Sequence, residues 1–101
     1  MQSNISRIED LRNDHNKDDF YWLEGRLVGI KRKLTKKGLE MMLGLFVERD
    51  ASAWAELIVL PDVYKEHKKR LVVGAELRLK GKFLISWGSA TLSVLEIEPV
   101  D

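Results

Sequence analysis

Apolar and polar residues alternate along several stretches of the chain, which predicts a protein built from β-strands. The clearest stretch runs from Leu77 to Phe83, where leucine, glycine and phenylalanine alternate with arginine and lysine. A period of two is the pattern of a strand with one buried face. Four more strands are predicted at about Phe20–Leu34, Leu39–Glu48, Trp54–Leu60 and Ala90–Ile97.

The first of these strands changes phase part-way along. Its alternating apolar set reaches Leu27. Val28 and Ile30 then continue the apolar pattern, with Gly29 at the change. Glycine at such a point is typical of a bulge or a sharp bend. One long, bent strand is therefore expected to serve two sheets.

A helix is predicted between the third and fourth strands, at about Asp62–Leu71. Pro61 and Asp62 suit its first turn, because the fixed backbone angle of proline starts a helix and a carboxylate is favourable at the positive end. No other helical pattern interrupts the strands.

Residues 1–19 form a polar extension with a short helical pattern of its own. The apolar residues at helical spacing are Ile5, Ile8 and Leu11. Ser3 and Asn4 are suitable N-terminal caps. A helix this short is not stable alone, so it either docks on the domain or frays. The predicted organisation is a helical or flexible extension, residues 1–19, followed by one folded domain, residues 20–99.

Three strands, a helix and two strands is the element order of the OB-fold, a five-stranded Greek-key barrel. The bent first strand fits, because one strand must close such a barrel on two sides. An SH3-like barrel is the structural alternative, but it usually lacks a helix at this place. The predicted class is all-β with one short helix between strands three and four.

Composition limits the functions that the chain can have. Its 101 residues correspond to one domain, and it contains no cysteine, so disulfides and thiolate metal sites are excluded. The N-terminus lacks the apolar core of a signal peptide, and no apolar run is long enough to cross a bilayer. No nucleophile motif, metal-ligand spacing or phosphate-binding loop is present. We therefore expect a cytoplasmic, non-enzymatic protein without a cofactor and without a membrane partner.

Positive charge is concentrated although the net charge is only +1. Residues 25–39 contain six basic side chains and no acidic one. A solvated hairpin tip would explain such a run, and so would a loop that contacts phosphates. The candidate phosphate-contacting residues of this loop are Lys31, Arg32, Lys33, Thr35, Lys36 and Lys37.

The sequence resembles a known family over about residues 20–99. The matching positions are Gly25, the run Thr35-Lys36-Lys37-Gly38, Met42, Glu48, Glu56, Pro61, Tyr64, Gly74 and Gly81. They resemble the OB domain in the C-terminal region of bacterial DNA polymerase III alpha subunits, within the tRNA-anticodon type of OB family. The turn at residues 48–53 differs, because it is one residue longer and lacks the family's glycine. The resemblance implies binding of single-stranded nucleic acid, with DNA favoured over RNA, and a role in DNA replication.

An OB-fold ligand crosses strands two and three, between the first loop and the loop joining strands four and five. We expect Phe46 and Trp54 to face outward there, opposite each other across a turn centred near Asp50. Trp87 is expected at the exposed tip of the last hairpin. These three aromatic side chains, bordered by basic loops, would stack on bases.

Two other interpretations of the aromatic residues remain open. Phe46 and Trp54 would equally serve as a cross-strand pair that stabilises the hairpin, or be covered by the N-terminal extension. The alternative function is an OB-fold protein-interaction module or accessory subunit, with replication or other nucleic-acid-processing proteins as partners. Its contact patch would be Met42, Phe46, Trp54 and Ile58.

Overall fold

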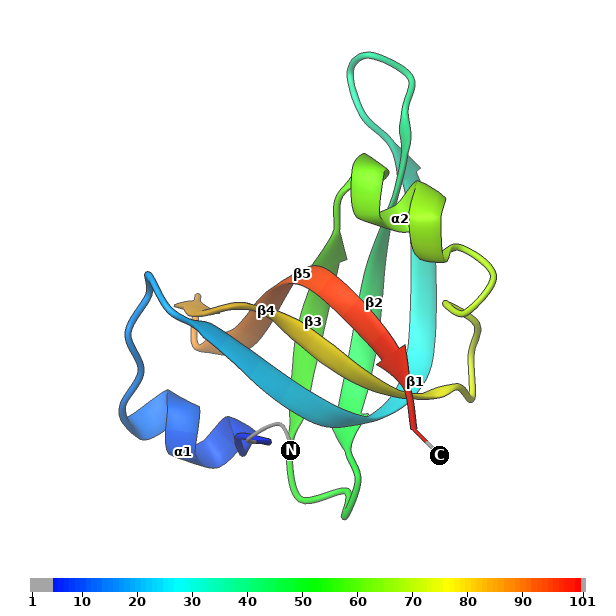
Figure 1. The fold of residues 1–101 in the computed structure, drawn as a ribbon. Helices are drawn as coiled ribbons and strands as arrows, with labels where there is room; N and C mark the ends of the chain where they lie inside the picture. Colours follow the sequence, from blue (N-terminus) through cyan, green and yellow to red (C-terminus); the bar gives the residue numbers. More distant parts are fainter. Residues whose placement is uncertain (1–4, 101) are drawn as a thin grey trace.

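Five strands close into a barrel in the order β1-β2-β3-β5-β4 in the computed structural model, which describes residues 5–100 (Figure 1). The strands are β1 (Phe20–Leu34), β2 (Glu40–Glu48), β3 (Trp54–Val59), β4 (Glu76–Ser86) and β5 (Ser89–Pro99). Helix α2 (Pro61–His67) lies between β3 and β4. The predicted all-β class and OB-type element order are confirmed.

Strand β1 is the bent strand that closes the barrel. Its first part, Phe20–Arg26, pairs with β4, and the part from Gly25 to Leu34 pairs with β2. The register shifts between Leu27 and Gly29, which confirms the predicted bulge. Gly25 stands where the two pairings overlap, and a Cβ there would lie 2.1 Å from the Val47 carbonyl oxygen. Only glycine lets the strands approach so closely.

Helix α2 closes one end of the barrel. Pro61 occupies its first turn as predicted, and the Tyr64 ring is buried against the core. The helix ends at His67, four residues before the predicted end, because Arg70 and Leu71 hydrogen-bond three residues back and tighten the chain into turns. Leu71 is nevertheless buried, so the predicted apolar face is used.

Helix α1 (Ile8–Asn13) lies at the opposite end of the barrel (Figure 1). Ile8 and Leu11 are buried in the same core as the strands, so the extension docks on the domain. Arg7 precedes the helix in an extended conformation, and the proposed caps Ser3 and Asn4 lie outside the described residues. Neither helix of the described chain has the length and apolarity that crossing a membrane would require.

The register of the β2–β3 hairpin corrects one prediction. Phe46 pairs with Ala55 and Val47 with Trp54, so Phe46 and Trp54 are not opposite each other. The Glu48 N–H donates to the Ala53 carbonyl at 2.9 Å, so four residues, 49–52, lie between this pair. This is one residue more than a turn centred on Asp50 assumes. A slip of one residue turns every side chain of a strand to the other face.

Candidate nucleic-acid interface

The outer face of β2 and β3 is an open, largely aliphatic surface. Leu43 pairs with Ile58 and Leu45 pairs with Glu56, and all four side chains point away from the core. A shallow groove of about 370 Å³ follows this face as far as the β4–β5 turn. Its lining residues, hereafter the groove, are Leu43, Gly44, Glu56, Leu57, Ile58, Leu84, Ser86, Trp87, Ser89 and Thr91.

Trp87 stands at the edge of the groove in the turn between β4 and β5. Its side chain is fully exposed, as predicted, with a relative accessibility of 102%. The turn has two residues, Trp87 and Gly88, whose φ angles are 53° and 80°. The indole therefore extends from the barrel without packing on it, and it borders the groove at one side.

A basic hairpin, hereafter the arm (residues 31–41), borders the groove at its other end. The arm extends beyond the barrel where β1 runs into β2 (Figure 1). Lys31 pairs with Leu43 and Lys33 with Met41, which places both lysines on the groove side of the hairpin. Two of the predicted phosphate-contacting residues thus share a face with the groove.

The other predicted arm residues have different places. Arg32 points to the opposite side, where its Nε donates to the Tyr64 hydroxyl of α2 at 2.9 Å. This hydrogen bond raises the pKa of the guanidinium. Thr35 shapes the tip, because its hydroxyl accepts from the Leu39 N–H at 3.1 Å. Lys36 and Lys37 are exposed in the tip itself.

The four lysines of the arm, Lys31, Lys33, Lys36 and Lys37, form no ion pair in the part of the chain that the structure describes. By contrast, Arg78 on β4 pairs with Glu24 at 3.1 Å, and Lys80 pairs with Glu96 at 3.1 Å. A cluster of unpaired, exposed lysines is the surface feature that attracts a phosphate backbone.

Phe46 is not part of this surface, and its predicted outward orientation is wrong. The ring is fully buried, packed in the barrel between its partners Leu27 and Ala55. Met42 is buried on the same face of β2, so the proposed protein-contact patch is also incomplete. A buried ring has no face on which a base could stack.

Trp54 has the predicted outward orientation and is 51% exposed. It lies beside a second hollow, between α1 and the two turns at this end of the barrel. Arg12 of α1 lines the same hollow and donates from Nη2 to the Gly88 carbonyl at 2.7 Å. The N-terminal helix therefore approaches Trp54 and holds the turn that carries Trp87, without burying either ring.

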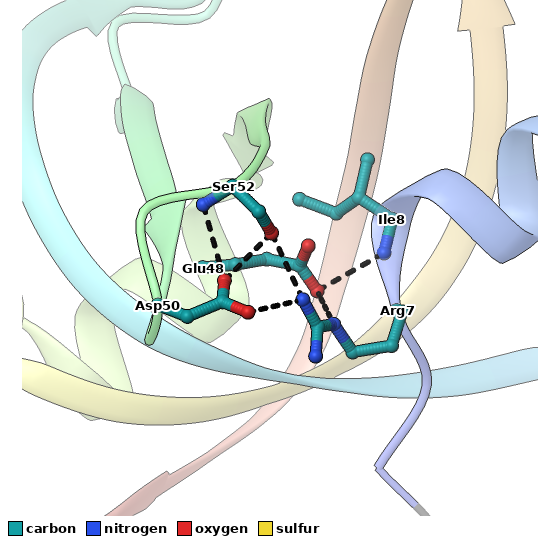
Figure 2. Close-up of polar contacts among 5 residues, drawn as sticks. All are labelled: Arg7, Ile8, Glu48, Asp50 and Ser52. Carbon is teal, nitrogen blue, oxygen red and sulfur yellow. Dashed lines mark hydrogen bonds and ion pairs between the residues drawn. The ribbon is translucent and has the colours of Figure 1, made fainter.

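A polar cluster, hereafter the latch, holds α1 in place (Figure 2). Arg7 donates from Nε to Glu48 Oε2 at 3.2 Å and from Nη2 to the Ser52 hydroxyl at 2.9 Å. The same guanidinium pairs with Asp50. The first N–H of the helix, at Ile8, also donates to Glu48 Oε2 at 3.1 Å. Glu48 is buried at the end of β2, so the latch joins α1 to the β2–β3 turn.

Sequence reasoning missed the groove floor and Arg12. Leu43 of the groove and its neighbour Leu45 were missed because β2 is apolar on both faces, so alternation alone does not say which face is outside. Arg12 gave no signal, since its partner is a backbone carbonyl far along the chain. Within residues 5–100, no group of three histidine or carboxylate side chains is placed to hold a metal ion.

Comparison with solved structures places this geometry in context. The SSB domain of a protein from Synechococcus sp. superposes with a TM-score of 0.69 at 16% sequence identity, over 84% of this chain and 99% of that chain. The mitochondrial single-stranded DNA binding protein of S. cerevisiae gives 0.64 at 11% identity, over 81% and 93%. The protein priB from Ralstonia solanacearum gives 0.62 at 15% identity, over 80% and 97%.

The chain has an OB fold, which it shares with these SSB-type domains. At these low identities the likeness concerns the fold alone. No family model matches the chain, and no curated protein matches it in sequence. Nothing in the comparisons links the chain to the polymerase III alpha subunit, so that finer relation remains a prediction from the sequence. The structural neighbours are described as binding proteins rather than enzymes.

Proposed function

We propose that this chain is a binding domain for single-stranded nucleic acid, with DNA as the favoured ligand. The observation that carries the proposal is the open groove on β2, β3 and β5, with an exposed tryptophan at one border and unpaired lysines at the other. Structural neighbours described as single-stranded DNA binding support the same ligand.

Each part of the surface has a distinct task in this proposal. Bases lie over Leu43 and Ile58 in the groove and stack on Trp87, because every base has an apolar face. Phosphates contact Lys31 and Lys33 on the groove side and the two lysines of the arm tip. Glu56 in the groove lies near the bases, where a carboxylate can accept a hydrogen bond but repels phosphate.

The wider setting of the domain is part of the proposal. A cytoplasmic location remains part of the proposal, and partners in replication or other nucleic-acid processing are what the sequence resemblance implies. A relation to the polymerase III alpha subunit rests on the Thr35-Lys36-Lys37-Gly38 run and the positions around it. The groove and the arm would work in the same way in a separate protein or as part of a larger one.

The arm lysines supply the test. We expect Lys36→Ala combined with Lys37→Ala to weaken binding of a labelled oligonucleotide to all sequences alike, because phosphate contacts carry no sequence information. Each lost contact lowers the slope of log K against log salt by about 0.7 for a single strand, so the pair lowers it by about 1.4. Fluorescence titrations with DNA and with the equivalent RNA, at several salt concentrations, measure both quantities.

The matched control is Lys65→Ala combined with Lys69→Ala, which removes the same charge from α2 and from the turn that follows it. It lowers the net charge equally, so only the position of the charge differs between the two variants. Equal slopes for both double variants would remove the arm from the site. Salt-independent binding of the wild-type domain to a protein partner, with no affinity for either oligonucleotide, would favour the protein-interaction module instead.

A further inference from the structure

A second group of aromatic and basic side chains lies outside the groove, on the outer face of β1 and β4. Lys80 Nζ lies 5.8 Å from the centre of the Phe20 ring and 5.9 Å from that of Trp22. Lys82 Nζ lies 5.4 Å from the centre of the Phe20 ring. These four residues, hereafter the outer cluster, come from two strands that pair directly, Phe20 with Lys82 and Trp22 with Lys80.

The members of the outer cluster differ in how free they are to bind. Phe20 is 45% exposed, whereas the core side chains of β1 are buried. Lys80 already pairs with Glu96 at 3.1 Å, so its charge is largely compensated. Lys82 is exposed, and no ion pair within the described chain uses it. An exposed ring beside an uncompensated lysine is the pairing that a base and its phosphate require.

The outer cluster is continuous with the groove along one row of cross-strand neighbours. Ile58 in the groove is opposite Ser93 of β5, Ser93 is opposite Lys82, and Lys82 is opposite Phe20. Directly opposite residues share a face of the sheet, so the row stays on the outside of the barrel. It continues the other way through Leu43 to Lys31 of the arm. The row runs across the strands, from the arm to the start of β1.

The length of this row suits a short piece of single strand. Three strand spacings separate Ile58 from Phe20, which is about 14 Å along the surface. A stacked strand rises about 3.4 Å per nucleotide, so no more than about four nucleotides cover the distance. Ser93 between them is small and polar, and neither its size nor its charge obstructs a strand that crosses β5.

We propose that the outer cluster is a second subsite for the same single strand, which leaves the groove across β5 and β4 and stacks a base on Phe20. Lys82 contacts the phosphate of that nucleotide, and Lys80 lies over the rings of both Phe20 and Trp22. The proposal rests on the proposed function of the groove and extends its footprint around the barrel. It requires that a ligand long enough to leave the groove binds more tightly than one that fills it.

The test compares two oligonucleotide lengths on three proteins. Oligothymidylates of about 4 and about 16 nucleotides span the site sizes of single OB-folds. For wild type we expect the longer one to bind at least about tenfold more tightly. Lys82→Ala and Phe20→Ala are expected to weaken binding of the longer one about tenfold and of the shorter one less than twofold, because stacking and phosphate contacts are lost only outside the groove.

Controls separate a binding role from a structural one. Val73→Ala, in the exposed connection after α2, matches Phe20→Ala as the truncation of an exposed apolar residue. Lys69→Ala matches Lys82→Ala in charge. Unlike Lys82→Ala, Lys82→Arg is expected to bind the longer oligonucleotide as tightly as wild type, since arginine both contacts phosphate and stacks. The melting temperatures of all variants show whether Phe20 merely stabilises β1. If Phe20→Ala does not fold, Lys82→Ala still tests the proposal, because Lys82 is on the surface.

The two failures are distinguishable. If wild type binds both lengths in a salt-dependent manner but Lys82→Ala weakens them equally or not at all, the outer cluster is not a subsite and the groove proposal stands. If wild type binds neither length, both proposals are overturned together.

Discussion

Trp87 occupies a backbone position that disfavours it. Its φ of 53° is in the left-handed region, which costs an ordinary residue about 1–2 kcal/mol. Two-residue hairpin turns with positive φ at both positions favour Asn-Gly, and here the pair is Trp87-Gly88. The indole is fully exposed, so no packing within the domain offsets the cost. The stacking on a base that we propose for Trp87 would account for a tryptophan in this position.

Replacing Trp87 with asparagine separates stability from binding. We expect Trp87→Asn to raise the free energy of unfolding by up to about 1 kcal/mol, because asparagine tolerates this backbone conformation. Affinity for single-stranded DNA is expected to fall about tenfold, since stacking is worth about 1–3 kcal/mol per base. Urea unfolding and fluorescence titration measure the two effects. A variant that binds as tightly as wild type would exclude Trp87 from the site.

At the scale of elements, the order of the strands and the bend in β1 could be read from the sequence, because each is encoded by a short local pattern. The register of β2 could not. Met42 and Phe46 on one face and Leu43 and Leu45 on the other are equally apolar, so the length of the next turn decides which set is buried. Glu48 made the buried face of β2 harder to recognise, because it is a charged residue on that face. Its burial depends on hydrogen bonds from Arg7 and Ile8, about forty residues away in the sequence.

The residues of the candidate site also fall into two groups, those that a local pattern predicts and those that depend on the register of β2. Lys36 and Lys37 at the arm tip and Trp87 in a hairpin turn were predictable, because a tip is exposed whatever the register of its strands. The outward orientation of Leu43 in the groove was not predictable, because it depends on the register of β2. Arg32 was assigned to the site by charge, but its hydrogen bond to Tyr64 across the fold places it on the other side of the arm.

The latch contains a carboxyl group, that of Asp50, whose titration differs between the folded and the unfolded chain. The hydroxyl and the backbone N–H of Ser52, followed by Arg7, lower the pKa of Asp50 from 3.8 to about 2. The unfolded chain therefore takes up this proton at a higher pH than the folded one does. The stabilising contribution of Asp50 is complete above about pH 4 and is lost as the pH falls toward 2.

Asp50→Asn tests this assignment. Asparagine keeps an acceptor for Ser52 but removes the charge that pairs with Arg7 and the titration that accompanies it. We expect urea unfolding of the variant to show a shallower loss of stability than wild type between pH 4 and 2. Because Asp50 is exposed at the surface, the difference is expected to be modest. Asp19→Asn, in the loop before β1, is the control and should follow the wild-type pH profile.

At the scale of the whole molecule, the two helices lie at the two ends of the barrel, and the groove follows its side wall. The net charge of +1 gives little long-range attraction, and the field that matters is local to the arm. Residues 1–19 were predicted as an extension that either docks on the domain or frays, and α1 does dock, because it contributes Ile8 and Leu11 to the core. Removing the extension would therefore open one end of the barrel.

The parallel pairing of β3 with β5 is the shortest ladder in the barrel, joining Glu56–Ile58 to Thr91–Ser93. It is the seam at which the sheet closes, and the proposed path of the single strand crosses it from Ile58 to Ser93. A ligand that contacts both strands of this pairing stabilises it, because separating the strands would break the ligand's contacts with one of them.

Hydrogen exchange followed by NMR can detect such an effect. Saturating single-stranded DNA is expected to slow exchange of the amides at Glu56–Ile58 and Thr91–Ser93 more than that of the β1–β4 amides, whose ladder is longer. Equal slowing everywhere would mean that the ligand stabilises the barrel only as a whole. Stronger slowing at the β3–β5 pairing would mean that the bound strand stabilises the closure of the barrel itself.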